Sequence, residues 1–237
     1  MLKLSNYSYE YIKGSPVVTN LNMEVMEGDV FAFVGQNGAG KTTTIKSIVG
    51  ITEPLSGKIT LDDIDIKKKP LKYKQNIAYV PDNPTLYEHL TGIQYLNFIA
   101  DMYEVSEKKR EEKINKYAKE LEIYDDLGDL LSSYSHGMKQ KIAIIAALVH
   151  DPKLYIFDEP FVGLDPKSSV TLKKIFKKLA EEKKIIFFST HVLDVAEKIC
   201  NKLAIIKDGK IVVSGNMKDI IKDKSLEDVF MELTDNA

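Results

Sequence analysis

The sequence that decides the fold of this chain reads Phe31-Ala32-Phe33-Val34-Gly35-Gln36-Asn37-Gly38-Ala39-Gly40-Lys41-Thr42-Thr43. An apolar run typical of a strand enters a loop with the pattern G-x-x-x-x-G-K-T, and a helical segment, residues 43–49, leaves it. The glycines let successive backbone N–H groups point inward, and the start of the helix adds donors and its positive dipole end. Lys41 offers a charge to the β- and γ-phosphates, and Thr42 offers a hydroxyl to Mg²⁺. The stretch predicts a site for ATP or GTP rather than a chance glycine turn, and the residues of this site are Gly35, Gln36, Asn37, Gly38, Ala39, Gly40, Lys41, Thr42 and Thr43.

The composition excludes several classes of protein. With 237 residues the chain has room for one large domain or two small ones, and its 33 Lys and Arg nearly balance its 35 Asp and Glu. A protein that binds nucleic acid usually carries a clear basic excess, so we expect no nucleic acid among the partners. Cys200 is the only cysteine, which excludes an intramolecular disulfide and fits a reducing compartment.

No secretory signal is visible at the start of the sequence. The longest apolar stretch, Ile142–Val149, falls far short of the ~20 residues that span a bilayer. We therefore expect a cytoplasmic protein. If it serves a membrane process, another chain must cross the membrane.

Runs of apolar and β-branched residues predict strands at Val30–Val34, Lys58–Leu61, Ile77–Pro81, Leu154–Phe157, Ile185–Ser189, Leu203–Lys207 and Lys210–Val213. Helical patterns separate many of them, which indicates an α/β core with a parallel sheet. Asp208-Gly209 predicts a hairpin between the last two runs. Residues 86–149 show helical periodicity and mixed charge instead. We expect a single domain over residues 1–237, with an α/β core at 1–84 and 150–237 and a helical subdomain inserted at 85–149.

Two carboxylates, Asp158 and Glu159, follow the apolar run 154–157. An acid at this position of a P-loop enzyme holds Mg²⁺, and the end of a strand in the same sheet would bring Asp158 beside Thr42. Glu159 is our candidate general base for the attacking water. His191 ends another core strand, where it could touch the γ-phosphate and hold water in line with Glu159. A strand-end acidic turn and a packed or surface histidine are the alternatives.

A second anion site is predicted at Ser135-His136-Gly137, ahead of the helical run 141–149. Ser135 predicts an N-cap, and its hydroxyl, the backbone of Gly137 and the start of the helix could bind a phosphate together. One nucleotide does not need two phosphate sites in the same chain. We therefore expect a head-to-tail dimer in which Ser135 and Gly137 of each subunit close over the nucleotide of the other.

These motifs together resemble the ATP-binding subunit of an ABC transporter, and the resemblance covers essentially the whole chain. Residues 35–43 resemble the Walker A loop, 154–158 the Walker B strand and 163–166 the D-loop, while His191 resembles the switch histidine. Residues 134–140 are similar to the family's signature motif in a divergent form.

Three positions carry the detail of this resemblance. His136 stands where the signature motif usually has its first glycine, and Met138 stands where it usually has a glutamine. Tyr11 matches the aromatic residue on which adenine stacks, with an ordinary surface tyrosine as the alternative.

The resemblance implies a P-loop NTPase (RecA-like) core, an N-terminal antiparallel β subdomain and an inserted all-helical subdomain. It implies hydrolysis of ATP with Mg²⁺, a homodimer or paralogous heterodimer on ATP binding, and a separate transmembrane permease. The chain would then lie on the inner face of the cell membrane through that permease. We expect the permease contact near residues 86–103, where an apolar groove or ordinary subdomain core is formed by Leu86, Tyr87, Leu90, Tyr95 and Phe98.

Two further features bear on the subfamily. Residues 225–234 resemble the C-terminal part of exporter-type ATPases that serve drugs, peptides, ions or polysaccharide precursors, so we expect export of an unidentified substrate. Asp82 stands where the family has a glutamine that reaches Mg²⁺ and senses the membrane subunit. Its carboxylate could ligate Mg²⁺ or merely cap the turn at 82–84.

Two other classes of protein compete with this interpretation. A soluble ABC ATPase acting on ribosomes or nucleic acid typically carries two cassettes or a long coiled-coil insertion, and the sequence shows neither. A P-loop nucleotide kinase would leave Ser135, Gly137 and Glu159 without a role.

Overall fold

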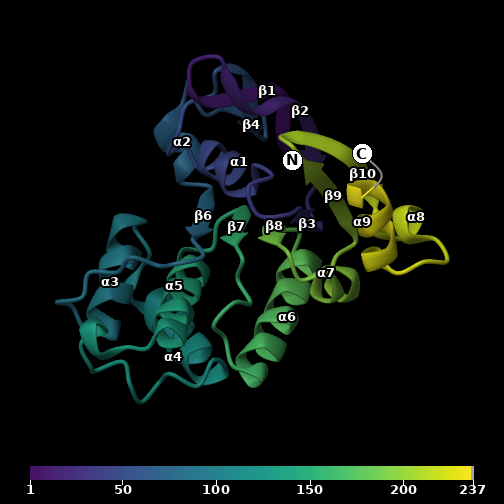
Figure 1. The fold of residues 1–237 in the computed structure, drawn as a ribbon. Helices are drawn as coiled ribbons and strands as arrows, with labels where there is room; N and C mark the ends of the chain where they lie inside the picture. Colours follow the sequence, from purple (N-terminus) through teal and green to yellow (C-terminus); the bar gives the residue numbers. More distant parts are fainter. Residues whose placement is uncertain (236–237) are drawn as a thin grey trace.

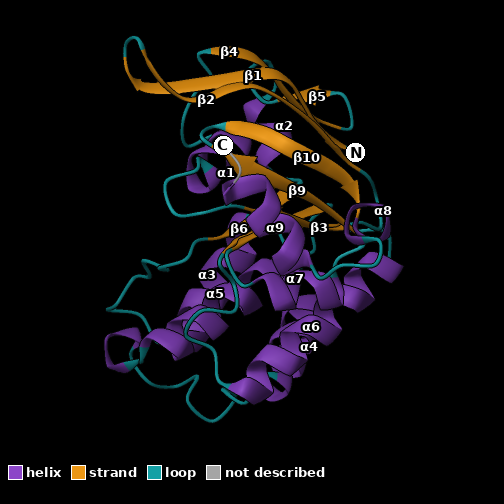
Figure 2. Cartoon of the chain, turned by 45° about the vertical axis from the view of Figure 1, so that its right-hand side comes forward, coloured by secondary structure: helices purple, strands orange, loops and turns teal. Residues whose placement is uncertain are grey.

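The computed structural model describes residues 1–235 and contains two β-sheets, with most of the helices below the second sheet (Figures 1 and 2). The first sheet is antiparallel, with the order β2-β1-β4-β5, and its strands are β1 (Leu2–Ile12), β2 (Ser15–Val25), β4 (Ser56–Leu61) and β5 (Ile64–Asp65). The second sheet has the order β10-β9-β3-β8-β7-β6, and its strands are β3 (Val30–Val34), β6 (Ile77–Val80), β7 (Leu154–Asp158), β8 (Ile185–Thr190), β9 (Lys202–Lys207) and β10 (Lys210–Asn216). The fold is the P-loop NTPase fold with an antiparallel β part and a helical part, as the sequence predicts.

The second sheet places the functional motifs along one edge. Strands β9, β3, β8, β7 and β6 run parallel, and only β10, joined to β9 through Asp208-Gly209, is antiparallel. The register pairs Val34 with Thr190 and Asp158 with Ser189. Since these residues all lie at the carboxyl ends of parallel strands, the loops that follow them meet at the same edge, where α/β sheets bind ligands.

Both faces of this sheet are covered. Along β3, Phe31 and Phe33 pack into a core shared with the antiparallel sheet, whereas Ala32 and Val34 pack into a core shared with the helices. Every residue of β3, β7 and β8 is buried, which explains why their sequences are almost continuously apolar instead of alternating.

The strand runs read from the sequence omit β1 and β2. These strands are long, but both contain an asparagine with positive φ, 48° at Asn6 and 51° at Asn20. Their mutual register shifts repeatedly between Leu4 and Ile12. Such bulges interrupt the two-residue alternation on which strand prediction depends, so the residues alone predicted only β4 of this sheet, and the family resemblance indicated the antiparallel arrangement.

The helices are α1 (Lys41–Ile48), α2 (Pro70–Lys74), α3 (Gly92–Met102), α4 (Glu107–Glu120), η1 (Leu131–Ser133), α5 (His136–His150), α6 (Pro166–Glu181), α7 (Leu193–Ile199), α8 (Met217–Ile221) and α9 (Leu226–Asp235). Helices α3, α4 and α5 lie together at the lower left of Figure 1. Thr91 and Gln94 form a capping box at the start of α3, a device that satisfies two terminal N–H groups. Within residues 1–235 no helix is long and apolar enough to cross a membrane.

Candidate active site

The loop between β3 and α1 is shaped by its glycines. A methyl group on Gly35 would lie 2.6 Å from the carbonyl oxygen of Ile206, and Gly38 and Gly40 have φ of +83° and +106°. Gly40 caps α1 without a side-chain hydrogen bond, so no side chain competes for the first N–H groups of the helix. α1 begins at Lys41, earlier than the predicted residue 43, because Gly40 can adopt the left-handed conformation. The result is a cradle of backbone donors for a phosphate group.

Lys41 lies folded over this cradle. Its Nζ donates to the carbonyl oxygens of Gly35 at 2.7 Å and Gln36 at 3.2 Å, and lies 3.9 Å from Oε1 of Glu159. Burial lowers the pKa of Lys41, and the carboxylates of Glu159 and Asp158 act in the opposite direction. The ammonium therefore lies on two neutral carbonyl oxygens of the loop, beside the backbone donors of the cradle.

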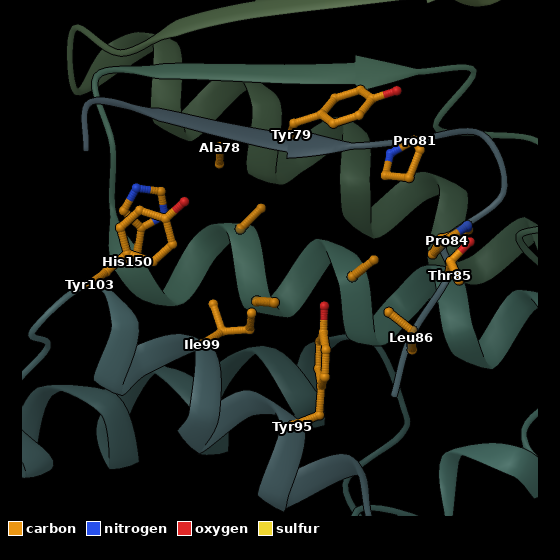
Figure 3. A pocket seen from close by; sticks show the side chains of 13 residues that line it. Ala78, Tyr79, Pro81, Pro84, Thr85, Leu86, Tyr95, Ile99, Tyr103 and His150 are labelled. Carbon is orange, nitrogen blue, oxygen red and sulfur yellow. The ribbon is translucent and has the colours of Figure 1, made fainter. Parts of the chain in front are cut away.

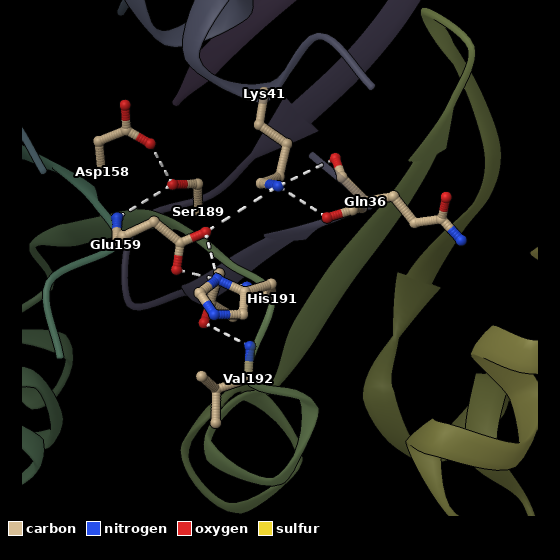
Figure 4. Close-up of polar contacts among 9 residues, drawn as sticks. Gln36, Lys41, Asp158, Glu159, Ser189, His191 and Val192 are labelled. Carbon is tan, nitrogen blue, oxygen red and sulfur yellow. Dashed lines mark hydrogen bonds and ion pairs between the residues drawn. The ribbon is translucent and has the colours of Figure 1, made fainter. Parts of the chain in front are cut away.

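Glu159 joins Lys41 to His191 (Figure 4). Its Oε1 lies 3.0 Å from Nδ1 of His191, and its Oε2 accepts a hydrogen bond from the backbone N–H of His191 at 3.3 Å. Glu159 has φ of +49°, a conformation that a residue other than glycine keeps only where its surroundings enforce it. The loops after β7 and β8 thus bring the two predicted residues into direct contact.

Ser189, for which the sequence predicts no role, lies between the two acidic residues. Its hydroxyl donates to Oδ1 of Asp158 and accepts from the backbone N–H of Glu159 at 3.1 Å. This bond supports the unusual backbone of Glu159 and orients Asp158. The available signal was a serine at the end of an otherwise apolar strand, but its partner belongs to another strand.

Thr42 and Asp82 lie with Lys41 and Glu159 on the wall of one cavity of about 210 Å³, whose other lining residues are Gln36, Asn37, Gly38, Gly40 and Thr43. Burial raises the pKa of Asp82, and the nearby carboxylates of Asp158 and Glu159 raise it further. Within residues 1–235 the side chain of Asp82 forms neither a hydrogen bond nor an ion pair. The turn-capping alternative for Asp82 therefore has no supporting contact.

Tyr11 reaches the edge of this site from β1. Its hydroxyl lies 3.2 Å from Oγ1 of Thr43, its ring meets that of Tyr9 edge-on at 4.9 Å, and 58% of the residue is exposed. An exposed ring that is fixed at its hydroxyl end beside the phosphate cradle can stack on a base.

Ser135 and Gly137 do not line the cavity. Ser135 caps α5, and its hydroxyl accepts from the backbone N–H of Met138 at 3.3 Å. Gly137 approaches the loop after Glu159, since a methyl group there would lie 2.6 Å from the carbonyl oxygen of Gly163. The structure therefore holds two separate phosphate-binding candidates in one chain.

Comparison with known proteins decides the family. The family described as ABC transporter matches residues 18–162. The ABC-type transporter ATP-binding protein EcsA of Bacillus subtilis is 33% identical over 93% of this chain and 91% of its own length. The chain belongs to the ABC transporter family. It is an ATP-binding subunit of an ABC transporter and hydrolyses ATP.

Other similarities agree with this membership. A solved structure described as the ATP-binding subunit of an ABC transporter is 33% identical, with a TM-score of 0.94, and covers 99% of both chains. The choline transport ATP-binding protein OpuBA of Bacillus subtilis is 35% identical over 98% of this chain, which spans 61% of that relative.

The residues at the carboxyl edge of the second sheet carry groups that suit different parts of ATP hydrolysis by an ABC ATPase. The cradle and Lys41 present backbone donors and an ammonium group, which suit the charge that develops on phosphate oxygens during hydrolysis. The carboxylate of Glu159 has the chemistry of a general base for water, and its contact with Nδ1 of His191 at 3.0 Å orients it. The oxygen donors Thr42, Asp158 and Asp82 suit a hard cation bound together with phosphate. Mg²⁺ would there neutralise charge on the phosphates.

Proposed function

We propose that this ABC ATPase powers export of a substrate through a separate membrane permease, on the inner face of the cell membrane. The class of substrate proposed is a drug, peptide, ion or polysaccharide precursor, and the support for this class is the resemblance of residues 225–234 to exporter ATPases. The chain is also similar to a relative named for choline transport, so overall similarity does not by itself identify the class of substrate.

The site roles belong to the same proposal. Glu159 is the base, with His191 and Lys41 as catalytic partners, and residues 35–43 with Tyr11 bind ATP. Thr42, Asp158 and Asp82 hold Mg²⁺. Ser135 and Gly137 complete the site of a second copy, either identical or paralogous, and no nucleic acid takes part. The cassette is one domain with its core at 1–84 and 150–237 and its helical part at 85–149.

The proposed contact with the permease is supported by a group of partly exposed aromatic residues beside a pocket. The rings of Tyr87 and Phe98 meet edge-on at 5.5 Å, and Tyr95 lies 6.3 Å from Tyr87. Tyr87 is 53% and Phe98 40% exposed, whereas Leu86 is buried in the core. Exposed aromatic residues that gather beside a pocket mark protein contacts.

Figure 3 shows Tyr95 and Ile99 of α3 facing a pocket below β6, with Leu86, Pro81 and Pro84 on its rim. The pocket also reaches α5, whose small residues Ala143, Ala146 and Ala147 line it. A short apolar helix of the permease could insert here. Pro81 and Pro84 line this pocket, and Asp82 between them lines the nucleotide cavity. A permease segment bound in the pocket would therefore be linked to the catalytic site.

Substitution of the aromatic pair tests the contact. Tyr87→Glu with Phe98→Glu should release the chain from membranes of cells that carry its permease, while the ATPase activity of the isolated chain stays unchanged. Tyr124→Glu is the control, because Tyr124 is similarly exposed (42%) and its ring stacks on neither Tyr87 nor Phe98. Unchanged membrane association of the double variant would contradict the proposed contact.

The direction of transport needs a separate measurement. ATP-driven uptake of a drug or of sodium into inverted membrane vesicles corresponds to export, and it should disappear with Glu159→Gln. Uptake driven by this ATPase in the opposite direction would contradict export and leave the ATPase assignment intact.

A further inference from the structure

The first turn of α5 lies against the loop that follows Glu159, residues 160–165. A methyl group on Gly163 would lie 2.5 Å from Cδ2 and 3.0 Å from Nε2 of His136, so the imidazole rests directly on this glycine. The neighbouring residue of α5, Gly137, approaches the carbonyl oxygen of Gly163 equally closely. Gly163 is therefore packed against His136 and Gly137 of the helical part of the chain, and no space is left for a side chain at position 163.

The two ends of the loop are fixed by other contacts. At one end, the ring of Phe161 packs 5.8 Å from Phe176 and 5.9 Å from Phe188. At the other end, Asp165 accepts from the backbone N–H of Ser168 at 2.8 Å and pairs with Lys141 of α5 at 2.9 Å. The segment between these two ends, residues 162–164, is the tip of the loop and is not fixed by these contacts.

The tip itself has few bonds of its own. Gly163 has φ of +79°, and in the described chain neither its N–H nor its carbonyl oxygen forms a hydrogen bond with another residue. The position of the tip therefore depends on packing against α5, and the loss of such packing makes a loop open locally.

We propose that His136 is a positioning residue for ATP hydrolysis, which packs on Gly163 and thereby ties the loop after Glu159 to the helical part of the chain. A rotation of α5 would displace Gly163 and, through it, the residues beside the base. Glu159 is sensitive to this displacement because its backbone conformation is enforced by its neighbours. The inference rests on the ATPase activity and is independent of the direction of transport.

Hydrogen exchange tests the contact directly. In His136→Ala, exchange of the Val162 amide, which donates to the carbonyl oxygen of Glu159 at 3.1 Å, should become several-fold faster, roughly 5-fold or more, with no change in residues 86–103. Alanine at the first position of α5 keeps the helix intact, and His136 is exposed, so the fold should be retained. Unchanged exchange of the Val162 amide would overturn the proposal.

Kinetics test the consequence. His136→Ala should lower kcat by about 3- to 10-fold, because small displacements of catalytic groups are costly, while KM for ATP and the thermal midpoint stay the same. His89→Ala is the control, since His89 is an exposed histidine far along the chain from this loop. An equal change in KM, or a lower midpoint with unchanged kcat, would indicate a role other than positioning.

A double-mutant cycle isolates the pair. Gly163→Ala should lower kcat strongly in the wild type, where its methyl group meets the imidazole, and several-fold less in His136→Ala. The cost of the positive φ is present in both backgrounds, so the difference reports the contact alone. Additive effects would contradict a direct action of His136 through Gly163.

Discussion

At the scale of single residues, the carboxylate of Glu159 is the centre of the site. It lies 3.9 Å from Nζ of Lys41 and 3.0 Å from Nδ1 of His191, so it can exchange one partner for a water molecule without leaving the site. Glu159→Gln keeps the size of the side chain but removes the proposed base. We expect ATP binding to persist and turnover to fall by about 10²- to 10⁴-fold.

Nucleotide binding and single-turnover hydrolysis measure the two effects separately. Lys41→Ala should instead bind nucleotide weakly, because the phosphate cradle loses its cation. Hydrolysis by Glu159→Gln at the wild-type rate would show that another group is the base.

Asp82 adds a negative charge to the wall of the cavity that receives the phosphates. Burial raises the pKa of Asp82, and the carboxylates of Asp158 and Glu159 raise it further, so a cation bound nearby would favour its charged form. Asp82→Ala should therefore raise the Mg²⁺ concentration for half-maximal ATPase activity, while nucleotide affinity without metal stays level or improves. Titration of ATPase activity with Mg²⁺ in the wild type and in Asp82→Ala tests this prediction. Superimposable curves would show that Asp82 has no role in metal binding.

At the scale of elements, the end of α5 is stacked on the end of α3. The ring of His150 lies 3.7 Å from that of Tyr103, centroid to centroid, and burial lowers the pKa of His150 to about 4. The unfolded chain takes up this proton at higher pH than the folded chain does. The contribution to stability is therefore complete above pH ~6.5 and is lost as the pH falls toward 4.

His150→Phe should remove this part of the pH dependence. The thermal midpoint of the wild type should fall more between pH 7 and pH 5 than that of the variant. His89→Phe, at an exposed histidine, is the control and should behave like the wild type. Equal decreases in His150→Phe and the wild type would show that this histidine does not titrate on unfolding.

At the scale of the whole molecule, the two phosphate-binding candidates lie apart, because Ser135 does not line the cavity formed by the loop after β3. In the proposed head-to-tail dimer, a second copy brings them together. In the Glu159→Gln background, Ser135→Arg should prevent the ATP-dependent dimer by placing a bulky cation where the partner's γ-phosphate must lie, without affecting nucleotide binding to the monomer.

Size-exclusion chromatography with ATP measures this dimer. Ser132→Arg is the matched control, since Ser132 is an exposed serine of η1 close in sequence. An ATP-dependent dimer of the Ser135→Arg protein would rule out the head-to-tail arrangement.

The sequence by itself determined the phosphate cradle, the acidic strand end and the α/β core. Each depends on local requirements: glycines at Gly35, Gly38 and Gly40 for the backbone, and apolar residues for strands that are buried on both faces. The bulged strands β1 and β2 escaped that reasoning because bulges interrupt the alternation of side chains. Only the tertiary structure placed Ser189 between Asp158 and Glu159, the hydroxyl of Tyr11 on Thr43, and His136 on Gly163. These contacts join residues far apart in the chain, and they depend on strand register and helix packing, which no local pattern of residues encodes.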